Sequence, residues 1–425
     1  MKVLIVGSGA REHALTWKAL QSQLSTAVYC APGNAATAAI AVNTDIPATD
    51  VDGIVRFVKE RDVGLTVIGP EASVAAGLAD RLGEAGRLVF GPTAAAGRIE
   101  TSKAFAKELM VRSGVATPQH HVFDDAARAR DFARGERRAF VVKADGLAKG
   151  KGTIVANDLE ETLRAIDQLM VDRNLGSAAD SILLEERIEG REVSLMALVD
   201  GRNVVALAPA CDYKRALEND AGPNTGGMGG YSPPGFFSSA DSQAAVHAVF
   251  EPVVAALAEA GTPYRGCLYA GLMVSERGTQ VLEFNARFGD PEAQVVLPRL
   301  DSDLLSMIEA AAAGNLSATT ASWSPRSSVG VVLTSKGYPG AYEVGMPIDG
   351  LGTIERDAFA FHGATDAGPS GYETAGGRVI TVVALGDTMA DARDRAYRNA
   401  QRIKFEGMSF RPDIARREIE VAALS

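Results

Sequence analysis

Short apolar runs alternate with helical patterns along the first hundred residues, and each run ends in a glycine or proline turn. The runs cover residues 3–6, 27–30, 65–68 and 88–90. Between the second and third runs, apolar residues recur at helical spacing over residues 51–58, behind Thr49 and Asp50, which can cap a first helical turn. Strands that alternate with helices predict a parallel sheet, covered by helices and joined by right-handed connections.

The pattern of apolar and polar residues changes near Thr101. Runs typical of strands cover residues 140–143, 153–155, 182–185 and 192–199, and the last is followed by Asp200-Gly201 and a further run over residues 203–207. An Asp-Gly step between two alternating runs is a strong hairpin signal. The middle of the chain is therefore predicted to contain antiparallel strands.

A third stretch runs from about residue 327 to the end. It offers strands at residues 329–334 and 378–384, and then a helix that Thr388 and Asp391 open in capping-box spacing. The Ser- and Thr-containing piece 317–328 is the best candidate for a linker before it.

Composition and charge narrow the class of protein. The 425 residues suffice for two or three domains. The formal charge of −10 disfavours binding to nucleic acid or to a membrane surface. The N-terminus lacks the apolar stretch of a signal peptide, and Cys30, Cys211 and Cys267 form no CxxC pair, so neither a disulfide framework nor a cysteine zinc site is expected. These features predict a cytoplasmic protein.

Glycine turns follow three of the N-terminal strands, and ligands of open α/β sheets bind at the carboxyl ends of strands. The turn Gly7-Ser8-Gly9 also opens a helix, which makes an anion site possible. A dinucleotide site would want a third glycine where Glu12 stands, and an acid after the second strand, which ends near Asn34. NAD is therefore disfavoured. Phosphate binding and tight strand-helix packing both remain open readings of these glycines.

A basic, glycine-rich loop follows the strand that ends at Lys143. Its residues of interest are Gly146, Lys149, Gly150, Lys151 and Gly152. Such a loop can drape amides and ammonium groups over a polyphosphate. It is not a Walker A loop, because its glycine spacing is one residue short and a strand follows instead of a helix. A solvated basic loop is the alternative.

Two oxygen donors share one face of a predicted strand. Glu283 and Asn285 are two residues apart, so period-two geometry places them together. A carboxylate and an amide oxygen, completed by water and phosphate oxygens, suit Mg²⁺. A polar strand end in solvent is the alternative. Arg287 and Asp290 follow directly, and either face the same cleft or pair with each other.

Five glycines crowd the segment 221–230, which suits a loop that approaches a ligand with its backbone. Asn224 and Thr225 add hydrogen-bonding groups. Charged residues suited to an anionic or zwitterionic ligand lie just upstream, namely Asp212, Lys214 and Arg215. The segment is interpreted as a substrate-binding loop, with a flexible linker as the alternative.

These motifs, in this order and over essentially the whole chain, resemble the phosphoribosylamine–glycine ligase family of ATP-grasp enzymes. The segments that carry the resemblance are GSGAREHALTWKAL, GPEAS, TSKAFAK, VVKADGLAKGKG, GPNTGGMGG and EFNARFGDPE. The resemblance implies an α/β fold with an N-terminal parallel α/β domain (1–100), a central ATP-grasp α+β domain (101–325) with a small lid at about 120–190, and a C-terminal α+β domain (326–425).

The resemblance also implies site residues. Binding of ATP falls to Lys103, Lys143, Gly146, Lys149, Gly150, Lys151 and Gly152 for the phosphates, Glu185, Glu186 and Arg187 for adenine, and Glu192 for the ribose. Catalysis is assigned to Arg287, Lys143 and Asp212, and Mg²⁺ or Mn²⁺ to Glu283 and Asn285. The substrates are assigned to Gly9, Asn34, Glu71, Lys214, Arg215, Asn224, Thr225, Gly226 and Gly227. Ser8 and Tyr213 stand where the family favours Asn and His, which bears on substrate contacts.

The activity implied is ATP-dependent joining of glycine to 5-phosphoribosylamine, the second step of purine biosynthesis. Transfer of the γ-phosphoryl group to glycine would give an acyl phosphate that the amine then attacks. A monomer or weak homodimer with small-molecule substrates is expected. A related ATP-grasp ligase, a nucleotide-binding regulator and, last, a nicotinamide dehydrogenase are the alternatives.

Overall fold

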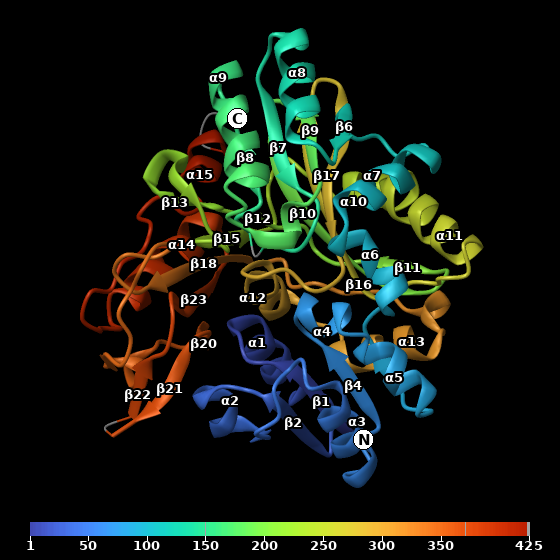
Figure 1. Cartoon of the computed structure of the whole chain (residues 1–425). Helices are drawn as coiled ribbons and strands as arrows, with labels where there is room; N and C mark the ends of the chain where they lie inside the picture. Colours follow the sequence, from blue (N-terminus) through green and yellow to red (C-terminus); the bar gives the residue numbers. More distant parts are fainter. Residues whose placement is uncertain (149, 370, 423–425) are drawn as a thin grey trace.

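The parallel N-terminal sheet is confirmed, with strand order β3-β2-β1-β4-β5. The computed structural model describes residues 1–148, 150–369 and 371–422, and this sheet lies at the base of Figure 1. Its strands are β1 (Lys2–Gly7), β2 (Ala27–Pro32), β3 (Val42–Asn43), β4 (Leu65–Ile68) and β5 (Val89–Phe90). Its helices are α1 (Ala10–Ala19), α2 (Ala35–Ile40), α3 (Val51–Glu60), α4 (Glu71–Ala75), α5 (Leu78–Glu84) and α6 (Ala94–Thr101). Asp50 caps α3 by accepting a hydrogen bond from the Gly53 N–H, as predicted.

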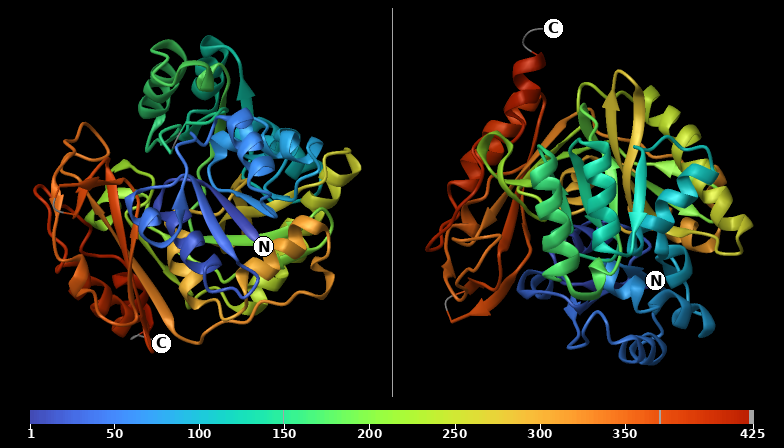
Figure 2. Two further views of the ribbon diagram at one scale, coloured as in Figure 1. Left: turned by 90° about the horizontal axis from the view of Figure 1, so that it is seen from below. Right: turned by 45° about the horizontal axis from the view of Figure 1, so that its top comes forward.

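A small antiparallel sheet of order β6-β9-β7-β8 stands apart from the rest of the molecule, at the top of Figures 1 and 2 (left panel of Figure 2). Its elements are β6 (His120–Phe123), α8 (Ala126–Glu136), β7 (Phe140–Ala144), β8 (Thr153–Val155), α9 (Leu159–Ile166) and β9 (Ile182–Glu186). The strands at 140–143, 153–155 and 182–185 are thus confirmed, whereas β6 was not predicted. Phe140, Val142 and Leu184 bury an apolar core of its own against α8 and α9, so this sheet, here called the small sheet, is a separate packing unit. The helix α7 (Lys103–Arg112) leads into it.

The large central sheet has the order β11-β10-β16-β17. Its strands are β10 (Arg191–Asp200), β11 (Val204–Ala206), β16 (Arg265–Ser275) and β17 (Gly278–Asn285), and its helices are α10 (Ser239–Ala245), α11 (Glu251–Glu259), α12 (Glu292–Val296) and α13 (Leu304–Ala313). The hairpin across Asp200-Gly201 is confirmed. Along β17, Glu283 lies opposite Gly271 but Val281 lies opposite Leu272, so Leu282 is an extra residue in a bulge.

The C-terminal region completes a sheet of order β12-β15-β18-β23-β20, and its first two strands come from the middle of the chain. The strands are β12 (Cys211–Asp212), β15 (Gly229–Ser232), β18 (Ser327–Thr334), β20 (Ala358–His362) and β23 (Arg378–Gly386), packed by α14 (Met389–Ala400). The chain also contains a hairpin of β13 (Arg215–Leu217) and β14 (Ala221–Asn224). It is completed by a further sheet of β19 (Pro347–Ile348), β21 (Thr365–Gly368) and β22 (Gly371–Thr374), and by α15 (Arg416–Ala422). The capping box of Thr388 and Asp391 is confirmed. The linker alternative for residues 221–230 is wrong, because β14 and β15 form there.

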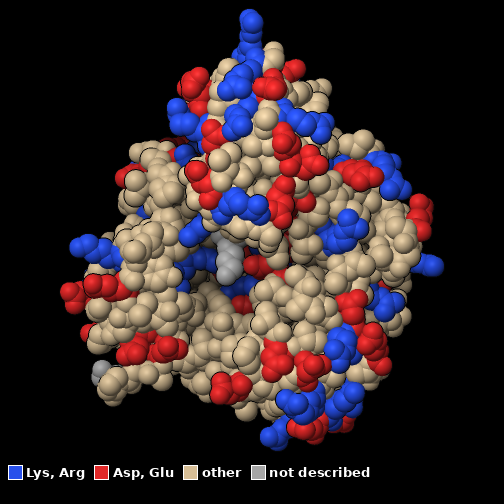
Figure 3. All heavy atoms as spheres, viewed as in Figure 1, with Lys and Arg blue, Asp and Glu red and all other residues tan. Residues whose placement is uncertain are grey.

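None of the helices in the described residues is long and apolar enough to cross a membrane. The carboxyl ends of the N-terminal strands face the other regions: Glu71, just after β4, lies 3.5 Å from Arg287, just after β17. Figure 3 shows a hollow near the centre of the molecule, where basic and acidic side chains gather between the regions.

Candidate active site

Two lysines share one buried carboxylate where the small sheet meets the central sheet. Lys143 Nζ on β7 lies 2.8 Å from Glu185 Oε2 on β9, and Lys107 Nζ on α7 lies 3.3 Å from the same oxygen. Glu185 is only 2 % exposed, and within the described residues its Oε1 has no hydrogen-bond partner. Burial lowers the pKa of Lys107 to about 8, against the opposing charge of Glu185. Lys107 was not predicted as a site residue, because in the sequence it resembles an exposed lysine of a helix, as Lys103 does.

Lys143 also bridges the two sheets. Its Nζ donates a hydrogen bond to the carbonyl oxygen of Leu282, the bulged residue of β17, at 3.1 Å. The bulge therefore turns a carbonyl toward the lysine and brings Lys143 close to Glu283. Oε2 of the Glu185 carboxylate thus holds both lysines.

The next two residues turn outward. Glu186 forms an ion pair with Arg277 at 2.8 Å, and its N–H donates to Gln119 O. Arg187 is exposed and donates to the Asn157 side chain at 3.1 Å. Their side chains are thus engaged by neighbouring parts of the chain.

Glu283 and Asn285 end β17 beside a concentration of positive charge. Burial raises the pKa of Glu283, but the charges of Lys214, Lys143 and Lys103 outweigh burial and hold that pKa below its usual value. Glu283 is therefore ionised. Asn285 Oδ1 accepts a hydrogen bond from Arg287 at 3.3 Å.

The donor set of Glu283 and Asn285 fits a hard cation. The described residues contain no group of three His, Cys, Asp or Glu side chains that could hold a metal ion. A carboxylate and an amide oxygen leave most coordination positions to water and phosphate oxygens, which is how Mg²⁺ binds beside nucleotides.

Arg287 lies between two glutamates from the N-terminal region. Its Nε is 3.5 Å from Glu71 Oε2 and 3.4 Å from Glu100 Oε1. Burial raises the pKa of Glu100, whereas Arg287 and Arg11 overcome burial and lower the pKa of Glu71. The reading in which Arg287 pairs with Asp290 is wrong, because Asp290 instead pairs with Arg378 at 3.0 Å, from β23. Arg287 thus joins the central sheet to the N-terminal strand ends.

Lys214 joins the residues expected at the ribose and at the substrate. Its Nζ lies 2.7 Å from Glu192 and 3.9 Å from Asp212. The charge of Lys214 lowers the pKa of Glu192. Burial, opposed by Lys214, raises the pKa of Asp212 to about 7. One carboxylate of this cluster is thus ionised at neutral pH, and the other is near its midpoint.

The glycine-rich segment lines a cavity of about 560 Å³. The lining residues are Lys151, Asn224, Thr225, Gly226, Tyr338, Pro339, Gly340, Ala341, Tyr342 and Arg378. Gly226 donates its N–H to Tyr338 Oη at 3.0 Å and accepts from Arg378. Thr225 Oγ1 accepts from the Gly227 N–H, and Asn224 donates to Thr153 O on β8. Arg378 and the 338–342 turn were missed, since they are a hundred residues or more away in the chain.

The basic loop after β7 reaches the same cavity. Gly146 donates its N–H to Ala178 O, and Gly152 O accepts from the Ala144 N–H. Gly150 has φ +77°, and a Cβ there would lie 3.2 Å from Thr225 O. Lys151 is exposed and lines the cavity, whereas Lys149 lies outside the described residues.

Two N-terminal candidates are engaged by the protein itself. The Gly9 N–H donates to the buried Glu12 carboxylate at 2.7 Å, so an acid of the chain already occupies the start of α1. Asn34 caps α2 through its Oδ1, and its Nδ2 donates to Ser8 O and His362 O. The tight-packing reading of these glycines fits this arrangement, and Glu71 is the N-terminal candidate that faces the hollow.

Comparison with known proteins finds relatives that match this chain over nearly its full length. Models of the phosphoribosylglycinamide synthetase N domain, ATP-grasp (A) domain and C domain match residues 1–100, 101–293 and 328–417. A phosphoribosylamine–glycine ligase of Yersinia pestis is 44 % identical over 424 residues, 99 % of each chain. One of Neisseria meningitidis is 42 % identical over 421 residues, 99 % of this chain and 100 % of the relative.

Solved structures agree with these sequence relatives. The phosphoribosylamine–glycine ligase of Thermotoga maritima superposes with a TM-score of 0.86 at 32 % identity, over 98 % of this chain and 100 % of that one. A biotin carboxylase of Campylobacter jejuni, at 14 % identity, has a TM-score of 0.74 over 96 % and 92 % of the two chains, which shows a shared fold.

Proposed function

Because the chain belongs to the phosphoribosylglycinamide synthetase family and is an ATP-dependent phosphoribosylamine–glycine ligase of purine biosynthesis, we propose that its reaction passes through glycyl phosphate. A carboxylate resists attack by an amine in neutral water, whereas an acyl phosphate carries a good leaving group. Transfer of the γ-phosphoryl group of ATP to glycine and attack by phosphoribosylamine would then give glycinamide ribonucleotide, ADP and phosphate. The observation that carries this proposal is the position of Glu283 at the end of β17, next to Leu282, whose carbonyl oxygen accepts a hydrogen bond from Lys143. The charges of Lys214, Lys143 and Lys103 outweigh burial and hold the pKa of Glu283 below its usual value.

The nucleotide would lie between the small sheet and β17. Lys103, Lys143 and the loop from Gly146 to Gly152 would neutralise its phosphates, the backbone of residues 185–187 would face adenine, and Glu192 would hold the ribose. Phosphoryl transfer asks mainly for positioning and charge neutralisation. Residues 120–190, as a lid within a domain spanning 101–325, would exclude water that hydrolyses the acyl phosphate; 1–100 and 326–425 would be the flanking domains.

Glu283 and Asn285 would hold Mg²⁺ or Mn²⁺, and the bound cation would neutralise charge on the β- and γ-phosphates. Arg287, fixed by Glu71 and Glu100, would hold the glycine carboxylate or the transferring phosphoryl group. The chain itself thus supplies positive charge on several sides of the reacting phosphate.

The phosphoribosylamine would enter the cavity beside the glycine-rich segment. Lys151 and Arg378 give this cavity positive charge, and Asn224, Thr225 and the tyrosine hydroxyls give it hydrogen-bonding groups. Lys214 and Asp212 lie just upstream of that segment. A carboxylate with a pKa near 7 suits removal of a proton from an attacking amine, so Asp212 would act as the base. Arg215 and the amides of Gly226 and Gly227 would complete the wall.

The test replaces Glu283 by Gln, which keeps the shape and removes the charge. Turnover should fall by about 10² or more, because a contact to transition-state charge is lost, while the melting temperature without ligands changes little. ADP release is measured with ATP, glycine and phosphoribosylamine, each omitted in turn. Glu276→Gln, on the exposed turn of the same hairpin, is the matched control and should keep full activity.

Near-normal turnover of Glu283→Gln at limiting Mg²⁺ would contradict the metal assignment. Full-rate ADP release with another amino acid would contradict glycine as the substrate. Hydroxylamine added to ATP and glycine without the amine should trap a glycyl hydroxamate, and its absence during ADP release would contradict the acyl phosphate.

A further inference from the structure

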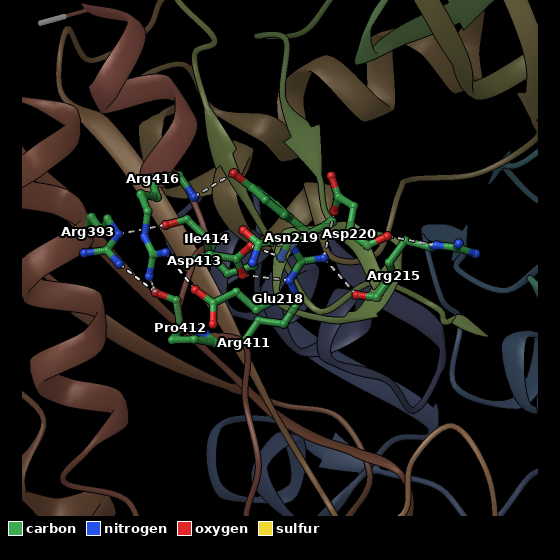
Figure 4. Close-up of polar contacts among 12 residues, drawn as sticks. Arg215, Glu218, Asn219, Asp220, Arg393, Arg411, Pro412, Asp413, Ile414 and Arg416 are labelled. Atoms are coloured by element: carbon green, nitrogen blue, oxygen red, sulfur yellow. Dashed lines mark hydrogen bonds and ion pairs between the residues drawn. The ribbon is translucent and has the colours of Figure 1, made fainter. Parts of the chain in front are cut away.

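The segment 411–416 folds back onto the turn of the β13–β14 hairpin, and a buried arginine lies at the junction (Figure 4). The Arg411 side chain is 1 % exposed. It binds both carboxylate oxygens of Asp413, at 2.9 and 2.7 Å. Its Nη1 also donates to Asp220 Oδ1 and to the carbonyl oxygen of Arg215, both at 2.9 Å. Arg411 therefore holds strand β13 and the turn of the hairpin at once.

Asp413 completes the junction from the other side. Its Oδ2 accepts a hydrogen bond from the Asn219 N–H at 3.0 Å. Asn219 and Asp220 adopt φ of +57° and +53°, a left-handed conformation that Asn and Asp tolerate best among residues with a side chain. The guanidinium of Arg411 also lies 4.7 Å from the ring centre of Tyr213. The shape of the turn is thus specified by contacts with residues 411–413, here called the C-terminal clamp.

The clamp is itself held by α14. Tyr397 Oη donates to Arg411 O at 2.6 Å, and Arg393 Nη2 donates to Pro412 O at 2.7 Å. Both partners are helical side chains that pack beside the C-terminal sheet. The clamp is therefore tied to a rigid element.

The end of the hairpin away from its turn carries the candidate site for phosphoribosylamine, here called the acceptor site. Arg215 lies opposite Asn224 in the strand pairing, and the Thr225 N–H donates to Lys214 O at 2.7 Å. The carbonyl that Arg411 binds belongs to the residue directly after Lys214. If this carbonyl moved, Lys214, which precedes Arg215, would move with it. Asn224 and Thr225, which pair with these two residues, would move as well.

Burying a guanidinium costs free energy that an apolar side chain would not cost. The contacts of Arg411 specify where strand β13 and the turn lie, which apolar packing would specify less well. We propose that Arg411 is a positioning residue that sets the geometry of the phosphoribosylamine-binding wall through the β13–β14 hairpin. The inference rests on the proposed function, in which Lys214, Asn224 and Thr225 form that wall.

Arg411→Lys tests the inference, because lysine keeps the charge but cannot bind a carboxylate and a carbonyl in the same fork geometry. The KM for phosphoribosylamine should rise about tenfold, since small misplacement of a binding group has large kinetic effects. The KM for ATP and the kcat should change less than the KM for phosphoribosylamine, because Arg411 contacts the hairpin and not the nucleotide residues. Arg416→Lys is the matched control: Arg416 pairs with Glu218 of the same hairpin at 2.7 Å, but its side chain is 43 % exposed. It should leave every kinetic constant unchanged.

The inference would be overturned if Arg411→Lys lowers the melting temperature but leaves the KM for phosphoribosylamine at the wild-type value. It would also be overturned if Arg416→Lys raises this KM as much as Arg411→Lys does. Should Arg411→Lys fail to fold, Asp220→Asn removes one partner whose side chain is 66 % exposed, and the acceptor KM should still rise severalfold. An unchanged acceptor KM there would also overturn it. Asn224→Ala separates the two proposals: if it leaves the acceptor KM unchanged, the assignment of the wall itself fails.

Discussion

Two glycine-rich segments line the same cavity and are built in opposite ways. Segment 222–230 is enclosed by other parts of the chain: Gly226 is bound by Tyr338 and Arg378, and a Cβ on Gly227 would lie 2.4 Å from Pro291 Cδ. Segment 146–152 is bound to the unit that contains the small sheet, through Gly146 and Ala178 O, and in the described part of the chain it approaches the other segment at Gly150.

The difference shows that glycine content alone does not indicate whether a loop moves. In segment 222–230 the glycines allow close approach of surrounding backbone and side chains, and the segment becomes a fixed wall. The described residues of segment 146–152 have few partners outside that unit, which is typical of regions that open locally at low free energy. We therefore expect mutations in segment 222–230 to change mainly the stability of the protein, and mutations in segment 146–152 to change mainly ligand binding.

The largest effect should come from Gly227→Ala. Gly227 has φ +112°, and the added Cβ would collide with Pro291. Strain and overpacking should lower the free energy of unfolding by about 2–4 kcal/mol, measured by urea denaturation. Gly83→Ala is the control, because a Cβ in that helix would meet nothing within 4 Å. Stability within experimental error of wild type in Gly227→Ala would show that this segment is not fixed.

Limited trypsin digestion should distinguish the two segments in the wild-type protein. Cleavage after the exposed Lys151 should occur without ligands, and should slow about tenfold with Mg²⁺ and a non-hydrolysable ATP analogue at ten times its Kd, if only the free form is cut. Cleavage after Lys214 or Arg215 should be absent in both conditions. Mass spectrometry identifies the fragments. Unchanged cleavage after Lys151 would mean that this loop does not cover the nucleotide.

The smallest effect should come from Gly150→Ala. Its φ of +77° makes alanine less favourable by about 1 kcal/mol. Because the loop opens without unfolding the rest of the chain, the melting temperature should hardly change, while the KM for ATP should rise about fivefold. Calorimetry and initial rates measure the two effects. A loss of stability as large as in Gly227→Ala would erase the distinction between the segments.

Much of the fold could be predicted because its signals are local. The strands β4, β8 and β10, the Asp200-Gly201 hairpin and the Thr388 capping box follow from residues within one or two turns of each other. The strands missed in the middle of the chain are short, and one of them has a distant partner: β15 pairs with β18 about a hundred residues later. No local pattern reports such a partner.

The candidate site divides in the same way. Lys143, Glu283 and Thr225 were proposed as site residues from motif chemistry alone. Lys107 reads as a surface residue of α7, yet the fold buries it against Glu185. Asn34 reads as a ligand contact, yet the fold engages its whole side chain between the N-terminal and C-terminal regions.

Order along the chain thus decided the secondary structure, the chemistry available at each strand end and, through whole motifs, the family resemblance. Only the folded chain decided which charges meet. Arg287 pairs with Glu71 and Glu100, about two hundred residues away, and Arg411 pairs with Asp220 across a similar separation. Periodicity and capping act over a few residues, whereas the strength of an ion pair depends on distance and burial, and both are set by contacts between distant parts of the chain.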